Sequence, residues 1–210
     1  MAAAKWMTGI TAAVWIAAAS AATAEEPGMY KGYETAPYRV LRQDGPVELR
    51  AYDPYLVAEV RVSGPRQQAV GRGFRTLASY IFGDNAASQK IAMTAPVAQV
   101  ALTPEPGAEA AQVWDVQFMM PAGSHPAALP VPDSAAIRFE ETAPRTEAVL
   151  RFSGFWTDRK LEAKAQELRG WIAAQGLTVT GGPRFYYYDD PFTLPFNRRN
   201  EVAFTLAGAG

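Results

Sequence analysis

Few residues in this chain are of the types that carry acid–base, nucleophilic or metal chemistry. The 210 residues include no cysteine and one histidine, His125. A Cys/His pair is therefore impossible, and a Ser/His/Asp triad would depend on His125, which lies in a proline-rich loop over residues 121–133. Zinc needs three or four His, Cys or carboxylate ligands, and the sequence offers no such cluster. His125 is left as a lone candidate metal ligand, and we expect a protein that is not an enzyme.

Charge and composition exclude a further class of protein. Twenty Lys and Arg stand against 21 Asp and Glu, for a formal net charge of −1. A non-specific nucleic-acid binder is expected to carry a basic excess, so we expect no nucleic-acid partner. A hydrophobic content of 49% is typical of a globular domain, and the chain is long enough to bury a core.

The first 24 residues have the pattern of a signal peptide. Lys5 supplies a positive start, residues 6–18 are an apolar run, and Ala22-Thr23-Ala24 fits the small-x-small cleavage rule. The run is short for a membrane span. We expect export, with no membrane span after cleavage, and a linker over residues 25–32. The alanine-rich composition, with more arginine than lysine, suggests a bacterial periplasm.

The first half of the mature chain reads as strands around one helix. Alternation on both sides of Asp44-Gly45 predicts a hairpin, and residues 55–62 read as a third strand. A helix is expected to follow Ser63-Gly64-Pro65 and to end near Phe82. Its expected buried stripe consists of Val70, Phe74, Leu77 and Ile81.

Two glycines interrupt this helix. Gly71 and Gly73 each cost about 1 kcal/mol relative to alanine in a helix interior. We therefore expect a backbone, a strand or a ligand to approach the helix closely there. Residues 90–97 then read as a strand with Pro96 at an end, edge or bulge. A loop over residues 104–111 leads to a strand over 113–120.

The second half repeats the order of the first. Residues 137–141 and 146–152 predict a second hairpin. A helix capped by Thr157 or Asp158 is expected to bury Leu161, Ala165, Leu168 and Ile172, and to end at Gly176. Strands over residues 185–188 and 201–206 follow. The order hairpin, helix, strand, strand thus occurs twice.

Two longer motifs resemble those of the SOUL family of haem-binding proteins. The first is Lys90-Ile91-Ala92-Met93-Thr94-Ala95-Pro96-Val97, and the second covers residues 188–202. The resemblance extends over residues 33–206, which leaves 207–210 as a tail. It implies an α+β fold, namely a distorted eight-stranded antiparallel β-barrel with two external helices, built from a duplicated hairpin-helix-strand-strand unit. Small-molecule-binding domains of bacterial regulators are similar.

The resemblance also implies a function. Members of the family bind haem or a related tetrapyrrole without catalysis, in an apolar groove beside the first helix, and buffering, scavenging or delivery of that ligand would follow. Aligned at Tyr80, the basic positions of the family fall at Gly71 and Ser79 and are lost here. Neighbouring arginines are the expected substitutes, and apolar side chains of the helix and of the 191–195 loop supply the contacts. The resulting candidate ligand-binding residues are Arg72, Phe74, Arg75, Ala78, Phe192 and Leu194.

An axial ligand for iron is not evident. His, Cys, Met and Tyr are the usual iron ligands. Some family members carry a histidine within a Tyr-Glu-x-Arg-x-Tyr run, but here that position is Ala51. Met93, Met119 and Met120 read as core fillers, and His125 remains the candidate metal ligand.

Two other functions stay open. The chain could be an interaction module that binds a protein, as yet unknown, or a membrane surface through a helix face. Alternatively, it could be an enzyme that acts on a small hydrophobic molecule with Glu or Tyr as acid and base.

Overall fold

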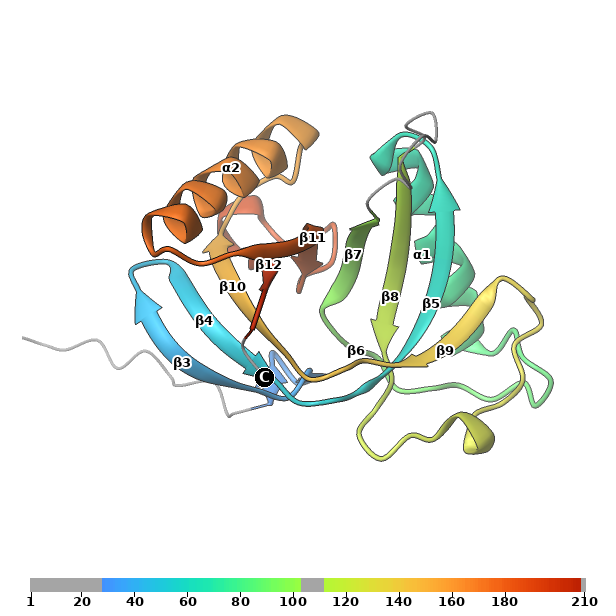
Figure 1. Cartoon of the computed structure of the whole chain (residues 1–210). Coiled ribbons are helices and arrows are strands. Elements are labelled where there is room, and N and C mark those ends of the chain that lie inside the picture. Colours follow the sequence, from blue (N-terminus) through green and yellow to red (C-terminus); the bar gives the residue numbers. More distant parts are fainter. Residues whose placement is uncertain (1–27, 103–111, 209–210) are drawn as a thin grey trace, which may run out of the picture.

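The computed structural model describes residues 28–102 and 112–208, and these form two sheets and two helices (Figure 1). The expected signal peptide and the expected 104–111 loop lie outside the described residues. The larger sheet has nine strands in the order β3-β4-β10-β12-β11-β7-β8-β5-β9, and all neighbouring pairs are antiparallel.

The bounds of these elements follow the chain. The large sheet consists of β3 (Tyr38–Asp44), β4 (Val47–Tyr52), β5 (Leu56–Ser63), β7 (Val97–Leu102), β8 (Val113–Met119), β9 (Ile137–Glu141), β10 (Arg145–Phe152), β11 (Val179–Tyr187) and β12 (Asn200–Leu206). The small sheet has the order β1-β2-β6 and consists of β1 (Met29–Tyr30), β2 (Tyr33–Thr35) and β6 (Thr94–Ala95). The helices are α1 (Arg66–Phe82) and α2 (Asp158–Ala174), with short 3-10 turns η1 (Pro126–Ala128) and η2 (Pro195–Asn197).

The duplicated order of elements is present. The first expected hairpin is confirmed, because β3 pairs with β4, but the second half pairs differently from expectation. In the first half, β5 is followed by α1, β7 and β8, and β8 pairs with both β5 and β7. In the second half, β10 is followed by α2, β11 and β12, and β12 pairs with both β10 and β11. The strands that precede these units are exchanged, because β4 pairs with β10 and β9 pairs with β5. The second expected hairpin is therefore wrong: β9 and β10 follow each other in sequence but do not pair with each other.

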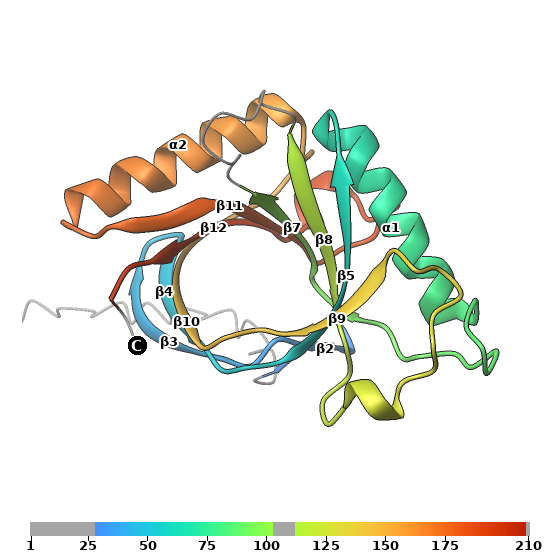
Figure 2. The ribbon, with the colours of Figure 1, turned by 45° about the vertical axis from the view of Figure 1, so that its right-hand side comes forward.

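The expected closed eight-stranded barrel is not found. The nine-stranded sheet curves strongly (Figure 2), yet its edge strands β3 and β9 pair only with β4 and β5, so among the described residues the sheet stays open. A bulge between Val40 and Arg42 interrupts the β3 edge, and bulges increase local twist and limit further pairing. The α+β class with two helices on the outer face is confirmed.

The first family motif forms less strand than its alternation predicts. Only Thr94 and Ala95 are in β6, which pairs in parallel with β2. The peptide bond between Ala95 and Pro96 is cis, and β7 begins directly after it. Pro96 has no N–H to donate to a ladder, so it divides the stretch into two short strands, as expected for a proline at a strand end.

Helix α1 is turned relative to its expected buried stripe. Leu77 and Ile81 are buried as expected, but the buried face also contains Ala69, Gly73 and Tyr80. A Cβ on Gly73 would lie 2.7 Å from Cγ2 of Val116 on β8, so the helix backbone rests directly on the sheet at this glycine. This close approach rotates Phe74, which was expected in the core, to the edge of the helix.

Helix α2 agrees with the sequence pattern throughout. Thr157 caps its N-terminus by accepting a hydrogen bond from the backbone N–H of Lys160, and Gly176 follows its end with a φ of 69°. Its four expected core residues are all buried. The apolar residues of α2 recur at helical spacing among charged ones, so the helix has only one apolar face that it could bury.

The concave face of the large sheet is unusually polar. Arg50 makes a two-pronged ion pair with Glu201, and Arg199 bonds to the same carboxylate. Nearby, the Tyr186 hydroxyl donates to Glu147. A cavity of about 10 Å³ lies on this face between Tyr and Met side chains, which is room for about one water molecule.

Candidate functional site

One strand of the large sheet lies between the two helices. Helix α1 packs on β5 and β8, and α2 packs on β10, β11 and β12, which leaves β7 between them (Figure 2). Phe118, Val97 and Tyr187 stand next to one another on β8, β7 and β11. Neighbouring strands are about 4.8 Å apart, so this row is about 10 Å wide. At its α1 end, the ring of Phe74 lies 5.4 Å from the ring of Phe118.

The loop between β11 and β12, residues 189–199, continues from the other end of this row. Asp190 fixes its first turn by accepting hydrogen bonds from the backbone N–H groups of Phe192 and Thr193, at 2.7 and 3.0 Å. Arg198 fixes the rest by donating to the carbonyls of Pro191 and Thr193, at 2.6 and 2.7 Å. Five such bonds within a short loop, including that between the Thr193 hydroxyl and Asp190, give it one defined shape.

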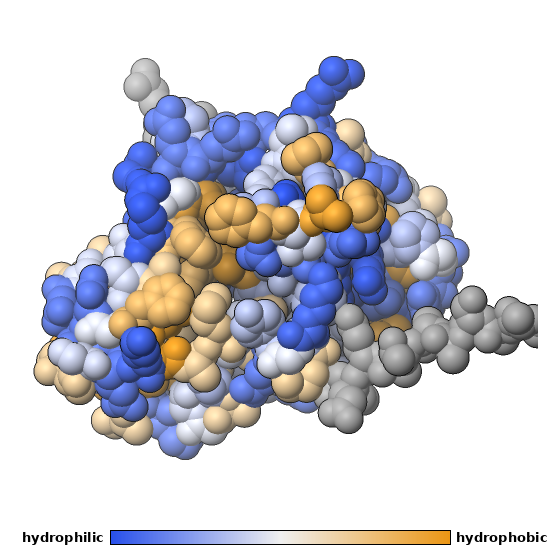
Figure 3. Space-filling model, turned by 180° about the vertical axis from the view of Figure 1, so that it is seen from behind, coloured by the Kyte–Doolittle hydropathy of each residue, from blue (hydrophilic) through white to orange (hydrophobic). Residues whose placement is uncertain are grey.

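This well-fixed loop holds apolar side chains out of the protein. Phe192 is 92% exposed, and Phe74 on α1 is 40% exposed. Phe155, Leu194 and Phe196 are also exposed apolar residues. We call the following five exposed side chains the apolar surface: Phe74, Phe155, Phe192, Leu194 and Phe196. Figure 3 shows hydrophobic side chains gathered on the rear face of the molecule, with the surface hollowed between them.

Buried contacts join α1 to the loop. Arg66, the first residue of α1, donates hydrogen bonds to the backbone carbonyl of Trp156 and to the hydroxyl of Tyr187. The guanidinium of Arg198 lies over the ring of Trp156, 4.5 Å from its centroid. Because Arg198 also holds the loop, Trp156 connects the start of α1 to the loop. The two walls of the apolar surface are therefore held in a fixed relation.

The two candidate arginines are three residues apart on α1, a spacing that places their side chains near each other on the helix surface. Arg72 donates a 2.6 Å hydrogen bond to the carbonyl of Ser63 at the end of β5. It is two residues from Phe74, and side chains with that spacing do not share a helix face. Arg75 is exposed, and its Nη1 would lie 3.6 Å from a Cβ on Gly71, three residues before Phe74. Arg75 thus folds back over Gly71, one helical turn before it.

The other candidates also have clear places. Ala78 is half-buried one turn after Phe74 and packs on the core beneath α1. Phe192 and Leu194 both belong to the apolar surface. The sequence did not single out Phe155 and Phe196. Phe155 follows β10 and Phe196 lies within η2, so their local positions were readable, but their shared exposure depends on how the loop folds back on Gly154.

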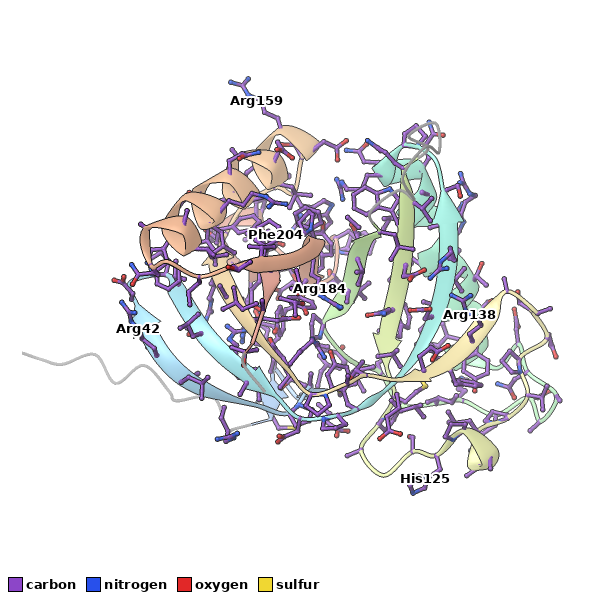
Figure 4. The ribbon with its side chains drawn as sticks, in the orientation of Figure 1. Arg42, His125, Arg138, Arg159, Arg184 and Phe204 are labelled. Atoms are coloured by element: carbon purple, nitrogen blue, oxygen red, sulfur yellow. The ribbon has the colours of Figure 1, made fainter. Side chains whose placement is uncertain are left out.

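His125 is not part of the apolar surface. It precedes η1 on the loop after β8, and Figure 4 shows it at the opposite end of the molecule from Arg159 at the start of α2. It lines a separate pocket with Tyr55, Met119 and Met120. No group of three or more His, Cys, Asp or Glu side chains in residues 28–102 and 112–208 could hold a metal ion.

The three consecutive tyrosines of β11 and its end are divided between the two faces of the sheet. Tyr186 and Tyr188 point to the concave face, where their hydroxyl groups donate to Glu147 and Glu201. Burial raises the pKa of Tyr186 well above its usual value, and Glu147 raises it further. A hydroxyl with this pKa stays protonated, which makes Tyr186 a hydrogen-bond donor rather than an acid–base group or an anionic metal ligand.

A protein-family model and two mammalian proteins match this chain. The family model described as "SOUL heme-binding protein" matches residues 33–205. Heme-binding protein 2 of Mus musculus is 30% identical over 172 residues, which cover 80% of this chain and 81% of that protein. The Homo sapiens protein of the same name is 30% identical over 190 residues, which cover 88% and 87%.

Among solved structures, the C-terminal domain of EcmrR has a similar fold. It is 15% identical, with a TM-score of 0.56, over 80% of this chain and 97% of that domain. At this identity the likeness concerns the fold alone. The family model and both relatives cover most of the chain, and the model's match includes the two motifs that carry β6 and the 189–199 loop. The chain therefore belongs to the SOUL haem-binding protein family.

Proposed function

We propose that this protein binds haem or a related tetrapyrrole on the apolar surface between α1 and the 189–199 loop, without catalysis. One observation carries the proposal: a loop fixed by its own hydrogen bonds holds Phe192 almost fully exposed beside other apolar side chains. Family membership and the names of both relatives support haem as the ligand. That the relatives are named as binding proteins supports a role other than catalysis.

The apolar surface fits the face of a flat ring system. Contiguous exposed apolar patches on soluble proteins commonly mark sites for ligands or partners. Covering such surface is favourable by roughly 25 cal/mol per Å². Because the loop is already ordered, little conformational entropy is lost when a ring lies on it. Rigid Phe192 and Leu194 on one wall and Phe74 on the other would contact the two edges of the ring.

Arg75 is the side chain placed to meet a carboxylate of the ligand. A tetrapyrrole such as haem carries two propionates, and arginine binds carboxylates with paired hydrogen bonds. Arg75 follows Phe74 directly in sequence and is exposed. Arg72, by contrast, is bonded to the backbone carbonyl of Ser63 and would first have to leave it.

Contacts to the ring rather than to iron dominate this proposed site. The five side chains of the apolar surface are Phe and Leu, which do not ligate iron, and His125 lies elsewhere. Binding should therefore depend weakly on the metal, and protoporphyrin should bind about as well as haem.

A titration with both ligands tests the proposal. The mature chain is titrated with haem and with protoporphyrin, and the Soret band and the protoporphyrin fluorescence are followed. The double variant Phe192→Ser/Leu194→Ser should lower both affinities at least about tenfold, since it removes most of one wall. Arg75→Glu should lower them about three- to tenfold, because it replaces attraction of a propionate with repulsion.

Leu41→Ser is the matched control. Leu41 is also an exposed apolar residue, but it lies in the bulge of the edge strand β3. Its substitution should leave both affinities unchanged. Equal losses in Leu41→Ser and the loop variant, or no saturable spectral change for the native chain at tens of micromolar, would refute the proposal.

An interaction module is the second candidate function. The exposed tip at Phe192 would also suit a membrane surface or an apolar protein groove. No helix among the described residues is both long and apolar enough to cross a membrane. Flotation of the mature chain with liposomes separates the two ideas, because a membrane binder loses flotation in Phe192→Ser/Leu194→Ser even without a tetrapyrrole. Export, and a role in buffering, scavenging or delivery, remain predictions.

A further inference from the structure

A second pocket lies away from the apolar surface. It has a volume of about 420 Å³ and is enclosed by the β2 segment, the turn before β5, the end of β8 with the loop that follows, and the end of β9. Drug-sized ligands occupy sites of roughly 300–1,000 Å³. No side chain of the apolar surface lines this pocket, so the two sites would bind independently.

The walls of the pocket are mainly apolar and stiff. Leu56, Met119 and Met120 form its buried side, and the ring of Tyr55 closes it toward the concave face of the sheet. Prolines and backbone from four separate segments make up much of the rest. A pocket with such walls is shaped before a ligand arrives, which limits the conformational entropy lost on binding.

Two carboxylates give this pocket its charge. Glu34 is half-buried, and both of its oxygens accept from the backbone N–H of Ala122, at 3.0 and 3.1 Å. Glu141 lies at the end of β9 and is exposed. Within the described parts of the chain, neither carboxylate forms an ion pair, and no lysine or arginine lines the pocket.

A cation behind the wall, Arg145, is already bonded to groups of the concave face. Arg145 donates to the Tyr55 hydroxyl at 2.7 Å, but it also makes a 2.7 Å ion pair with Glu147. Glu147 also lies 3.4 Å from Arg184, so these two guanidinium groups share one carboxylate on the concave face. The pocket keeps the negative charge of Glu34 and Glu141.

We propose that this carboxylate pocket binds a small apolar cation, such as a protonated aromatic amine, whose ring contacts Met119, Met120 and Tyr55 and whose ammonium group meets Glu34 and Glu141. The same charges reject the propionates of a tetrapyrrole. The pocket is thus a second ligand site with the opposite charge preference to the apolar surface, and it stands whether or not the apolar surface binds haem.

Three probes with one ring test the charge preference. 1-Naphthylmethylamine is cationic at pH 7, 1-naphthylmethanol is neutral, and 1-naphthaleneacetate is anionic. Binding is measured by saturation-transfer NMR and by calorimetry. The amine should bind at least about tenfold more tightly than the alcohol, and the acetate should not compete with the amine.

Carboxylate variants test where the amine binds. Glu34→Gln/Glu141→Gln should weaken amine binding about tenfold and abolish its advantage over the alcohol. The amide oxygen that replaces a carboxylate oxygen at position 34 can still accept from Ala122, so folding should be preserved, which the melting temperature checks. Glu140→Gln is the matched control, because the side chain at position 140 projects from the opposite face of β9 to that at 141 and does not line the pocket.

Each outcome decides the proposal. Equal binding of amine and alcohol, unchanged amine binding in the double Gln variant, or absence of saturable amine binding at millimolar concentration would overturn it. Haem binding should be unaltered in the double Gln variant, so failure here is distinguishable from failure of the proposed haem site.

Discussion

Individual buried charges do much to define this fold. Glu201 on β12 is fully buried, and both of its oxygens are bonded to Arg50 and Arg199. Burial alone would raise the pKa of the Glu201 carboxyl, but the two guanidinium groups outweigh it and lower the pKa to about 2. The ordinary value is 4.5. The folded state therefore binds a proton at Glu201 less readily than the unfolded chain does.

This pKa shift predicts how stability depends on pH. Each pKa unit corresponds to about 1.4 kcal/mol, so Glu201 contributes about 3 kcal/mol to the free energy of unfolding. Since its folded pKa is the lower one, the contribution is complete above about pH 5 and is lost as the pH falls from 4.5 toward 2. Urea unfolding at pH 7, 4 and 3 should show the native chain losing stability faster than Glu201→Gln.

The variant itself provides the reference. At pH 7 Glu201→Gln should be about 3–5 kcal/mol less stable, because it leaves two buried guanidinium groups without their carboxylate. The other carboxylates titrate in both proteins, so the difference between the two curves isolates Glu201. Parallel curves from pH 7 to pH 3 would show that the ion pair does not carry this contribution.

At the scale of elements, two glycines of α1 separate two causes of helix stability. Gly73 faces Val116, which is fully buried, and a Cβ there would lie 2.7 Å from it. Gly71 has only the end of the Arg75 side chain nearby, at 3.6 Å. The sequence predicted close approach at these glycines, and the structure shows it at Gly73 alone.

Alanine substitutions at the two positions should therefore change the free energy of unfolding in opposite directions. Gly73→Ala should lower the free energy of unfolding by about 1–3 kcal/mol, since it forces α1 away from β8. Gly71→Ala should raise it by about 0.5–1 kcal/mol through helix propensity. Thermal and urea unfolding measure both changes. Stabilisation by Gly73→Ala would mean that the helix can move off Val116 at little cost.

The same comparison shows what the sequence could predict of the elements. Helix α2 follows from its pattern, because Leu161, Ala165, Leu168 and Ile172 leave no other face to bury. The periodicity of α1 fits two neighbouring faces, and the choice between them is made by contact of Gly73 with Val116 on β8, which no local pattern contains. For the same reason Phe74 was expected in the core, yet it forms part of the apolar surface.

Across the whole molecule, the segments farthest apart in sequence are fastened together. Exchange of β4 and β9 between the halves is one case. It could not be predicted because β4 pairs with the distant β10 in addition to its expected partner β3, and β9 pairs with β5 instead of with β10, which follows it in sequence. The second case is the contact between the N-terminal segment of the fold and the 189–199 loop. Tyr30 and Lys31, expected to be part of a linker, both donate to Asp189 at the start of the 189–199 loop. Asp189 also accepts from the backbone N–H of Arg199, which closes the loop.

This fastening predicts that the N-terminal segment controls the apolar surface without touching it. The double variant Tyr30→Phe/Lys31→Ala removes two of the three donors to Asp189 and should loosen the loop while leaving Phe192 and Leu194 in place. Amide hydrogen exchange of residues 190–199 should accelerate several-fold, and the affinity for protoporphyrin should fall about threefold, because order in the loop must then be regained on binding. Lys164→Ala, which removes a lysine paired with Glu167 on α2, is the control and should change neither quantity. Unchanged exchange in the double variant would show that Asp190 and Arg198 hold the loop by themselves, and that the N-terminal segment has no part in shaping the ligand surface.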